Sequence, residues 1–309
     1  MGSYIRKRFF SNLLALWVIV TITFFLMKAI PGDPFTQEKA LPKEILQSLY
    51  EHYKLNDPWY VQYGNYLKSI LTWDLGPSFK YKARTVNDII KSGFPVSATL
   101  GLEALSISLF FGVSLGAIAA LKQNRWQDYL AMVVAVIGIS VPSFILAAFL
   151  QYFFSIKLDL FPVARWGTFQ QSVLPALALA ALPTAFIARL TRANMVEVLS
   201  MDYIKTARSK GIGSGLVILK HGLRNALLPV VTYLGTLTAN ILSGSFIIEK
   251  IFGIPGLGQW FINSITNRDY TVIMGITVFY SIVLLSVIFL VDLAYGWIDP
   301  RIKLDKRSA

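Results

Sequence analysis

The side chains that could do chemistry in this chain are few. Among its 309 residues there is no cysteine, and the two histidines are His52 and His221. We therefore expect no thiolate nucleophile and no metal site. The sequence contains no H-E-x-x-H pattern and no Gly-Lys dipeptide, so it lacks the G-x-x-x-x-G-K-[ST] loop that holds nucleotide phosphates. We predict that the chain is not an enzyme and has no cofactor of its own.

The most informative segment is basic and joins two apolar runs. It reads Asp202-Tyr203-Ile204-Lys205-Thr206-Ala207-Arg208-Ser209-Lys210-Gly211, and His221, Asn225 and Pro229 follow it. We expect a helix from about Ser200, as N-cap, to Lys210, because Gly211 can adopt the left-handed conformation that ends helices.

One face of this helix is predicted to touch a partner. Tyr203, Ile204 and Ala207 share that face, and the small Ala207 and Gly211 would let another backbone approach closely. On the residues alone, docking to a protein and contact with lipid headgroups fit equally well. His221 and Asn225 are four residues apart, so we expect them to bond each other or nearby backbone.

The segment resembles the EAA loop of the permease subunits of binding-protein-dependent ABC importers, in the peptide and nickel branch. There, D-Y-x-x-T-A-x-x-K-G is followed by H-x-x-x-N-x-x-x-P, whereas the E-A-A of the sugar-transporter consensus reads Lys205-Thr206-Ala207 here. The resemblance implies a coupling helix seated in a groove of a separate ATPase subunit, which would hold ATP and Mg²⁺. It assigns coupling to Asp202, Tyr203, Thr206, Ala207, Lys210, Gly211, His221, Asn225 and Pro229.

Three further motifs match the same branch. They are Pro31-Gly32-Asp33-Pro34, Ile254-Pro255-Gly256-Leu257-Gly258 and Asp299-Pro300-Arg301-Ile302. The second holds a proline and two glycines, which cannot continue a regular helix without cost. We expect a bend there, either a simple turn or part of a gate.

Composition identifies the chain as a membrane protein. Its residues are 55% hydrophobic and 15% charged, against about 25% charged in soluble domains. Because a span needs about 20 mostly apolar residues, we predict six: Phe9 to Ile30, Pro95 to Leu121, Tyr129 to Ile156, Val173 to Leu190, Val230 to Ile248 and Val272 to Ile298. The first is too long for a typical signal peptide, so we expect an uncleaved anchor.

The net charge of +12 is explained by orientation in the membrane. If the N-terminus is cytoplasmic, residues 1–8, 122–128, 189–229 and 299–309 are too. These segments hold 16 basic and five acidic residues, whereas residues 31–94 hold eight and seven. This is the positive-inside distribution, with both termini in the cytoplasm, so no nucleic-acid partner is needed. Residues 31–94 are then extracytoplasmic, and we expect short helices that cap the bundle, contact an external partner, or do both.

Polar residues inside spans are candidates for a substrate path. Ser140, Ser143 and Gln151 would lie on one stripe of the third span, and Thr236, Asn240 and Ser243 on one stripe of the fifth. We select Glu103, Gln151, Asn240 and Ser243 as candidate pathway residues. Helix packing is the alternative, and we assign Gly112 and Gly116 to it. Glu103 and Asp292 lie near opposite ends of their spans, so we expect no shared proton relay. Structural pairing or snorkelling is the alternative to a pathway role for both acids.

The sequence therefore predicts an all-α membrane protein with six transmembrane helices and an extracytoplasmic helical insertion, which is the type I ABC importer permease fold. Its parts are residues 1–30 with the first span, the insertion 31–94, and a core 95–309 with a coupling loop 192–229. The expected partners are a homologous permease in a heterodimer, two ATPase subunits, an extracytoplasmic binding protein and the lipid bilayer.

The resemblance implies ATP-driven import of peptides across a bacterial or archaeal plasma (inner) membrane. Nickel chelates or another small solute are the alternative cargo. An ion-driven secondary transporter is the less favoured class, and it would need acids near the midplane. A lipid-surface scaffold is the remaining alternative.

Overall fold

Long helices dominate the fold. The computed structural model describes residues 2–30, 35, 43–81 and 83–298. Four of its helices are long and apolar enough to cross a membrane: α1 (Gly2–Ala29), α4 (Val86–Leu121), α7 (Phe169–Ser200) and α13 (Tyr270–Ile298). In the described part of the chain, β-structure amounts to one bridge, between Pro77 and Thr85. The predicted all-α class is confirmed.

The third predicted span is not a single helix. Its residues form α5 (Trp126–Ser140), α6 (Ser143–Leu150) and the π-helix η1 (Gln151–Lys157), and the two halves are bent by 105°. Proline pushes the residue before it out of the helical region, and Val141, before Pro142, is extended with φ −90° and ψ 119°. The single stripe of Ser140, Ser143 and Gln151 is therefore wrong.

The C-terminal half continues with shorter elements. After α7 come α8 (Asp202–Ser209), α9 (Ser214–Leu216), the π-helix η2 (Val217–Leu223), α10 (Arg224–Ala226), α11 (Leu228–Phe252) and α12 (Leu257–Asn267). The fifth predicted span corresponds to α11, whose apolar stretch is Leu228–Ala239. If the bent pair of α5 with α6 and η1 is counted as one span, up to five segments are long and apolar enough to cross a membrane. The number of six spans therefore stays a prediction. The motifs at 31–34 and 299–302 lie outside the described residues.

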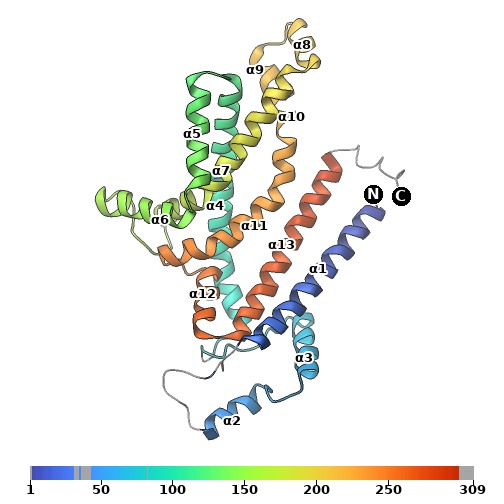
Figure 1. Ribbon diagram of the computed structural model, residues 1–309, viewed down its shortest axis with the longest axis vertical. Helices are drawn as coiled ribbons and strands as arrows, with labels where there is room; N and C mark the ends of the chain where they lie inside the picture. The colour runs from blue at the N-terminus through green and yellow to red at the C-terminus, as the bar shows by residue number, and fades with distance from the viewer. Residues whose placement is uncertain (1, 31–34, 36–42, 82, 299–309) are drawn as a thin grey trace.

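The two ends of the molecule differ. Helix α8 lies at one end of the long axis, toward which the start of α1 and the end of α13 also point, and α2 (Lys43–His52), α3 (Trp59–Leu71) and α12 lie toward the other (Figure 1). We call these the α8 end and the α12 end. The predicted short helices of the insertion are thus present. Whether they also meet an external partner stays a prediction.

Helix α3 is fastened to α1 through aromatic rings. Phe24 packs against Tyr63 and Tyr66 with ring centroids 5.3 and 5.9 Å apart, and the hydroxyls of Thr21 and Tyr63 are 2.7 Å apart. Burial, with Tyr63 nearby, raises the pKa of the Tyr66 hydroxyl, which stays neutral at ordinary pH. This packing supports the predicted cap on the bundle.

Helices α4 and α7 form the most extensive contact between any two helices of the described chain, and glycine permits their close approach. A Cβ atom at Gly112 would lie 2.7 Å from the Cβ of Ile187, and one at Gly116 would lie 2.5 Å from the carbonyl oxygen of Ala188. The assignment of these glycines to packing is confirmed. Their run also reads G-x-S-x-G, but it lies inside α4 rather than on the strand-to-helix turn that a nucleophile elbow requires.

Gly116→Ala is expected to destabilise the protein, because the added methyl group meets the backbone of α7. Overpacking of this kind costs about 1–3 kcal/mol. Gly64→Ala in α3 is the matched control, since nothing lies within 4 Å of its Cβ position and alanine favours a helix interior by about 0.5–1 kcal/mol. Thermal unfolding of the purified protein should show a lower midpoint for Gly116→Ala only. Equal midpoints for Gly116→Ala and the wild type would contradict this packing.

Candidate functional site

Helix α8 follows α7 after a single extended residue. Met201 has ψ 151° and separates the two helices. The predicted helix is present over Asp202–Ser209, but Ser200 is not its N-cap, because the Ser200 hydroxyl donates to the carbonyl of Glu197 at 2.7 Å and belongs to α7. The end of α7 therefore leads directly into α8.

The inner face of α8 packs against the chain's own core. Ile204 is fully buried and Ala207 is 7% exposed, and both cluster with Val217 of η2, with Leu199 and Ile212 at the edge. The prediction that Ile204 and Ala207 form a docking face is wrong, because the helix beginning at residue 217 covers them. The small size of Ala207 instead suits close packing within the chain.

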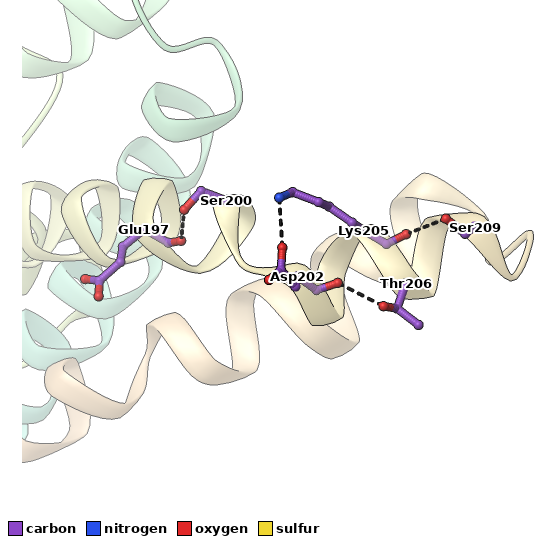
Figure 2. Close-up of polar contacts among 6 residues, drawn as sticks. All are labelled: Glu197, Ser200, Asp202, Lys205, Thr206 and Ser209. Carbon is purple, nitrogen blue, oxygen red and sulfur yellow. Dashed lines mark hydrogen bonds and ion pairs between the residues drawn. The ribbon is translucent and has the colours of Figure 1, made fainter.

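The outer face of α8 is polar and exposed. It carries Asp202, Lys205, Thr206 and Ser209 (Figure 2). The Lys205 ammonium group lies 2.8 Å from the Asp202 carboxylate, and the hydroxyls of Thr206 and Ser209 each donate to a carbonyl four residues earlier at 3.0 Å. This face can meet a partner while Ile204 and Ala207 stay buried.

Gly211 ends the α8 segment in the predicted left-handed conformation. Its φ is +78°, its Cβ position has no atom within 4 Å, and its N–H donates to the carbonyl of Arg208 at 2.9 Å. The preceding Lys210 is the exposed C-cap of α8. A side chain at Gly211 would strain the backbone without meeting a neighbour.

A second tie joins α8 to the helix that precedes α11. The Asn225 amide donates to the Tyr203 hydroxyl at 3.0 Å and to the His221 carbonyl at 2.9 Å. The expected bond to nearby backbone is therefore present. His221 lies in η2, and Pro229 lies in the first turn of α11, where its missing N–H is tolerated. Of the predicted coupling residues, the structure brings Tyr203, His221 and Asn225 together.

An ion pair between a buried carboxylate and a partly exposed guanidinium fixes the base of this assembly. Arg192 of α7 donates to both carboxylate oxygens of Asp128 in α5, at 2.5 and 2.7 Å, and Asp128 is 2% exposed. The backbone N–H of Asn124 also donates to Asp128 at 3.0 Å. The pair holds the α4–α5 connection against α7 about two turns before α7 ends at Ser200. The sequence offers no signal for it, because the partners are 64 positions apart.

The structure describes the side chains of two of the four candidate pathway residues, Glu103 and Gln151. Glu103 is half-buried on α4, and the Gln151 amide donates to the carbonyl of Val163 at 2.6 Å, which ties down the loop after η1. The side chains of Asn240 and Ser243 lie outside the described part of the structure. Pathway lining by these four residues stays a prediction.

The other acid predicted inside a span is paired. The Asp292 carboxylate lies 3.4 Å from Nε of Arg8 in α1. Of the two alternatives expected for Asp292, structural pairing and snorkelling, this contact supports the pairing. Sequence reasoning missed two fully buried acids, Glu249 and Asp269, which fall just outside the predicted spans. The sequence did contain an indication for Glu249, namely its position five residues before the Ile254-Pro255-Gly256 bend.

Comparison with known proteins places the chain in a family. Residues 112–304 match the model described as binding-protein-dependent transport system inner membrane component, and residues 1–102 match the model of the N-terminal part of such components. The chain belongs to this family of binding-protein-dependent transport permeases. Family membership agrees with the apolar helices and makes the chain an integral membrane protein.

Relatives of the permease match it along its whole length. The dipeptide transport system permease protein DppB of Bacillus subtilis (strain 168) is 54% identical over 308 residues, covering 100% of both chains. The oligopeptide transport system permease protein OppB of Salmonella typhimurium is 43% identical over 305 residues, covering 98% of this chain and 100% of that protein. The suspected resemblance to permeases of this branch is thereby confirmed.

A solved structure shows that the fold is shared. A crystal structure of an amino acid ABC transporter with histidines matches with a TM-score of 0.54 and 18% identity, covering 68% of this chain and 94% of that one. The predicted ABC importer permease fold is confirmed by this similarity.

Among the residues that the structure describes, no group of three metal-ligating side chains occurs in the permease.

Arg192→Ala is expected to destabilise the permease strongly, because it leaves the Asp128 carboxylate buried without its partner. Breaking a fully buried pair on one side costs about 3–5 kcal/mol, and we expect a smaller loss here because the Arg192 side chain is 29% exposed. The double variant Asp128→Ala/Arg192→Ala removes both charges and should recover part of that loss. Thermal unfolding of the two variants and of Asp128→Ala completes the comparison. If the double variant is as unstable as the sum of the singles, the pair is not coupled as described.

Proposed function

We propose that this chain is the transmembrane permease subunit of an ATP-driven peptide importer and forms half of its translocation pathway. The observation that carries the proposal is α8, whose buried inner face leaves a polar outer face exposed at one end of the bundle. Full-length relatives named as dipeptide and oligopeptide permeases support it.

Peptides are the favoured cargo. The names of the relatives favour peptides over nickel chelates, the alternative that the sequence left open. The same names support a non-enzymatic role, and the chain has no Gly-Lys dipeptide from which a phosphate-binding loop could be built. ATP and Mg²⁺ would be held by two separate ATPase subunits.

The assembly would contain a second, homologous permease as heterodimer partner, the two ATPases and an extracytoplasmic binding protein. The positive-inside distribution supports a cytoplasmic position for the α8 end and both termini in a bacterial or archaeal cell, with the insertion outside the inner membrane. Glu103, Gln151, Asn240 and Ser243 remain the candidates for lining the path.

The mechanism follows from how α8 is attached. ATP binding would bring the two ATPase subunits together, and the coupling helices of the two permeases, which are bound to them, would approach each other. Because α8 follows α7 directly and packs on η2, a displacement of α8 would move α7 and η2. The Asp128–Arg192 ion pair would then move the α4–α5 connection together with α7. The chain thus supplies a two-state bundle whose equilibrium is biased from outside.

Gly211→Ala is expected to weaken the attachment of the ATPases, because alanine at φ +78° strains the turn that ends α8. The strain is about 1–2 kcal/mol, so copurification of the ATPase subunits should fall severalfold. Gly253→Ala is the matched control: Gly253 also has a positive φ, +63°, with nothing within 4 Å, but it is the C-cap of α11, four residues before α12 begins. It should retain the ATPases. Equal retention by both variants would remove the docking role of α8.

Reconstitution tests the activity itself. Vesicles that hold the chain with its partner permease and ATPases should take up peptide only with internal ATP and an external binding protein. Uptake by vesicles that hold this chain alone, driven by an ion gradient, would instead establish a secondary transporter and refute the proposal.

A further inference from the structure

Two buried carboxylates hold α12 at its two ends. Glu249 lies in the last turn of α11, and Asp269 lies between α12 and α13. Both are fully buried, yet in the part of the chain that the structure describes neither forms an ion pair with a lysine or arginine. Each is satisfied by hydrogen-bond donors from other elements, so each works as a connection rather than as a free acid.

The Glu249 carboxylate joins three helices. One oxygen accepts from the Ser97 hydroxyl of α4 at 2.7 Å, and the other accepts from the N–H groups of Gly258 and Gln259 at 2.8 and 3.2 Å. Ser97 in turn accepts from the N–H of Leu257 at 2.9 Å. The first N–H groups of a helix have no partner within it, and here α4 and α11 supply those partners to α12.

The glycines of the Ile254-Pro255-Gly256-Leu257-Gly258 motif make room for this connection. A Cβ atom at Gly256 would overlap the Glu249 carboxylate and the Ser97 hydroxyl, and one at Gly258 would lie 2.5 Å from Cα of Phe246. The motif is thus a bend, as expected, and its glycines let α12 approach the carboxylate closely.

The Asp269 carboxylate joins the insertion to the start of α13. It accepts from the Ser78 hydroxyl and from the N–H groups of Phe79 and Lys80 at 3.2 and 3.4 Å. It also accepts from the N–H of Val272 in the first turn of α13 at 3.3 Å. The last segment of the insertion is therefore bound to the far end of α12.

The side of α12 contacts the same segment of the insertion. The Trp260 ring meets Tyr81 edge-on with centroids 4.9 Å apart, and the Arg84 guanidinium lies 5.2 Å from its centroid. The Asn267 amide donates to the Tyr81 hydroxyl at 3.3 Å. A displacement of residues 78–81 and of Arg84 would therefore act on α12 along its length.

We propose that Glu249 and Asp269 are positioning residues that make α12 a rigid link between the insertion and the bundle. When an external protein binds the insertion, the resulting displacement is transmitted through Asp269 to α12, and from α12 through Glu249 to α4 and α11. This inference rests on the proposed function, which supplies that external protein. The inference adds to the proposed function a route by which a loaded binding protein at one end of the bundle stimulates ATP hydrolysis at the other end.

Glu249→Gln and Asp269→Asn test the link with little change in volume. Each replaces an accepting oxygen with an NH₂ group that faces N–H or O–H donors. The assembled complex of two permeases and two ATPases is placed in lipid nanodiscs, and ATP hydrolysis is measured with and without peptide-loaded binding protein. Each variant should lower the stimulation by about three- to thirtyfold, with basal hydrolysis within about twofold of wild type.

The double variant separates a link from general stability. Because both residues act through one helix, breaking the link twice should cost no more than breaking it once, whereas independent losses of stability would add. Asp159→Asn, which changes an exposed acid in the loop after η1, is the control and should keep full stimulation. If Glu249→Gln fails to assemble, Ser97→Ala tests the same connection from α4.

Two results would overturn the inference, namely wild-type stimulation in both single variants, or additive losses with falling complex yield in the double variant. Absence of stimulation in the wild-type complex would refute the proposed function instead, so the two failures are distinguishable.

Discussion

The close approach of α4 and α7 is the constraint on which the rest of the structure depends. At Gly116 the two helices come so near that a single methyl group would meet the backbone of Ala188. This approach sets the direction of α7, which brings Arg192 to Asp128 and leads into α8. In a bilayer the hydrophobic effect does not hold helices together, so packing of small residues has to do so. The position of α8 is thus set within the membrane part of the chain.

Apolar contacts and hydrogen bonds act at both ends of the bundle, but the buried contacts of α8 and α12 differ in kind. At the α8 end an apolar cluster of Ile204, Ala207 and Val217 holds a short helix whose outer face stays polar. At the α12 end, carboxylates bind backbone N–H groups in buried positions. Apolar contacts are non-directional, whereas hydrogen bonds fix orientation. The α12 end is therefore built to keep one geometry, and the α8 end to present a surface.

Hydropathy and turn chemistry predicted much of the helical framework. The long apolar runs gave α1, α4, α7 and α13, and Gly211 gave the end of α8, because both depend on local properties of the sequence. Other features depend on contacts between distant positions. The run through Val141 and Pro142 is apolar on both sides, so composition did not show that the chain turns by 105° there. The spacing of Ile204 and Ala207 showed a shared face but not that η2 covers it.

The central claim is that the outer face of α8, and not the surface at the opposite end, meets the ATPase. The chain has no cysteine, so a single cysteine at Thr206 can carry a photoactivatable cross-linker in the assembled complex, with one at the exposed Leu71 of α3 for comparison. We predict that the probe at residue 206 cross-links to an ATPase subunit and the probe at residue 71 does not. Cross-linking to an ATPase from residue 71, or from neither position, would contradict the claim.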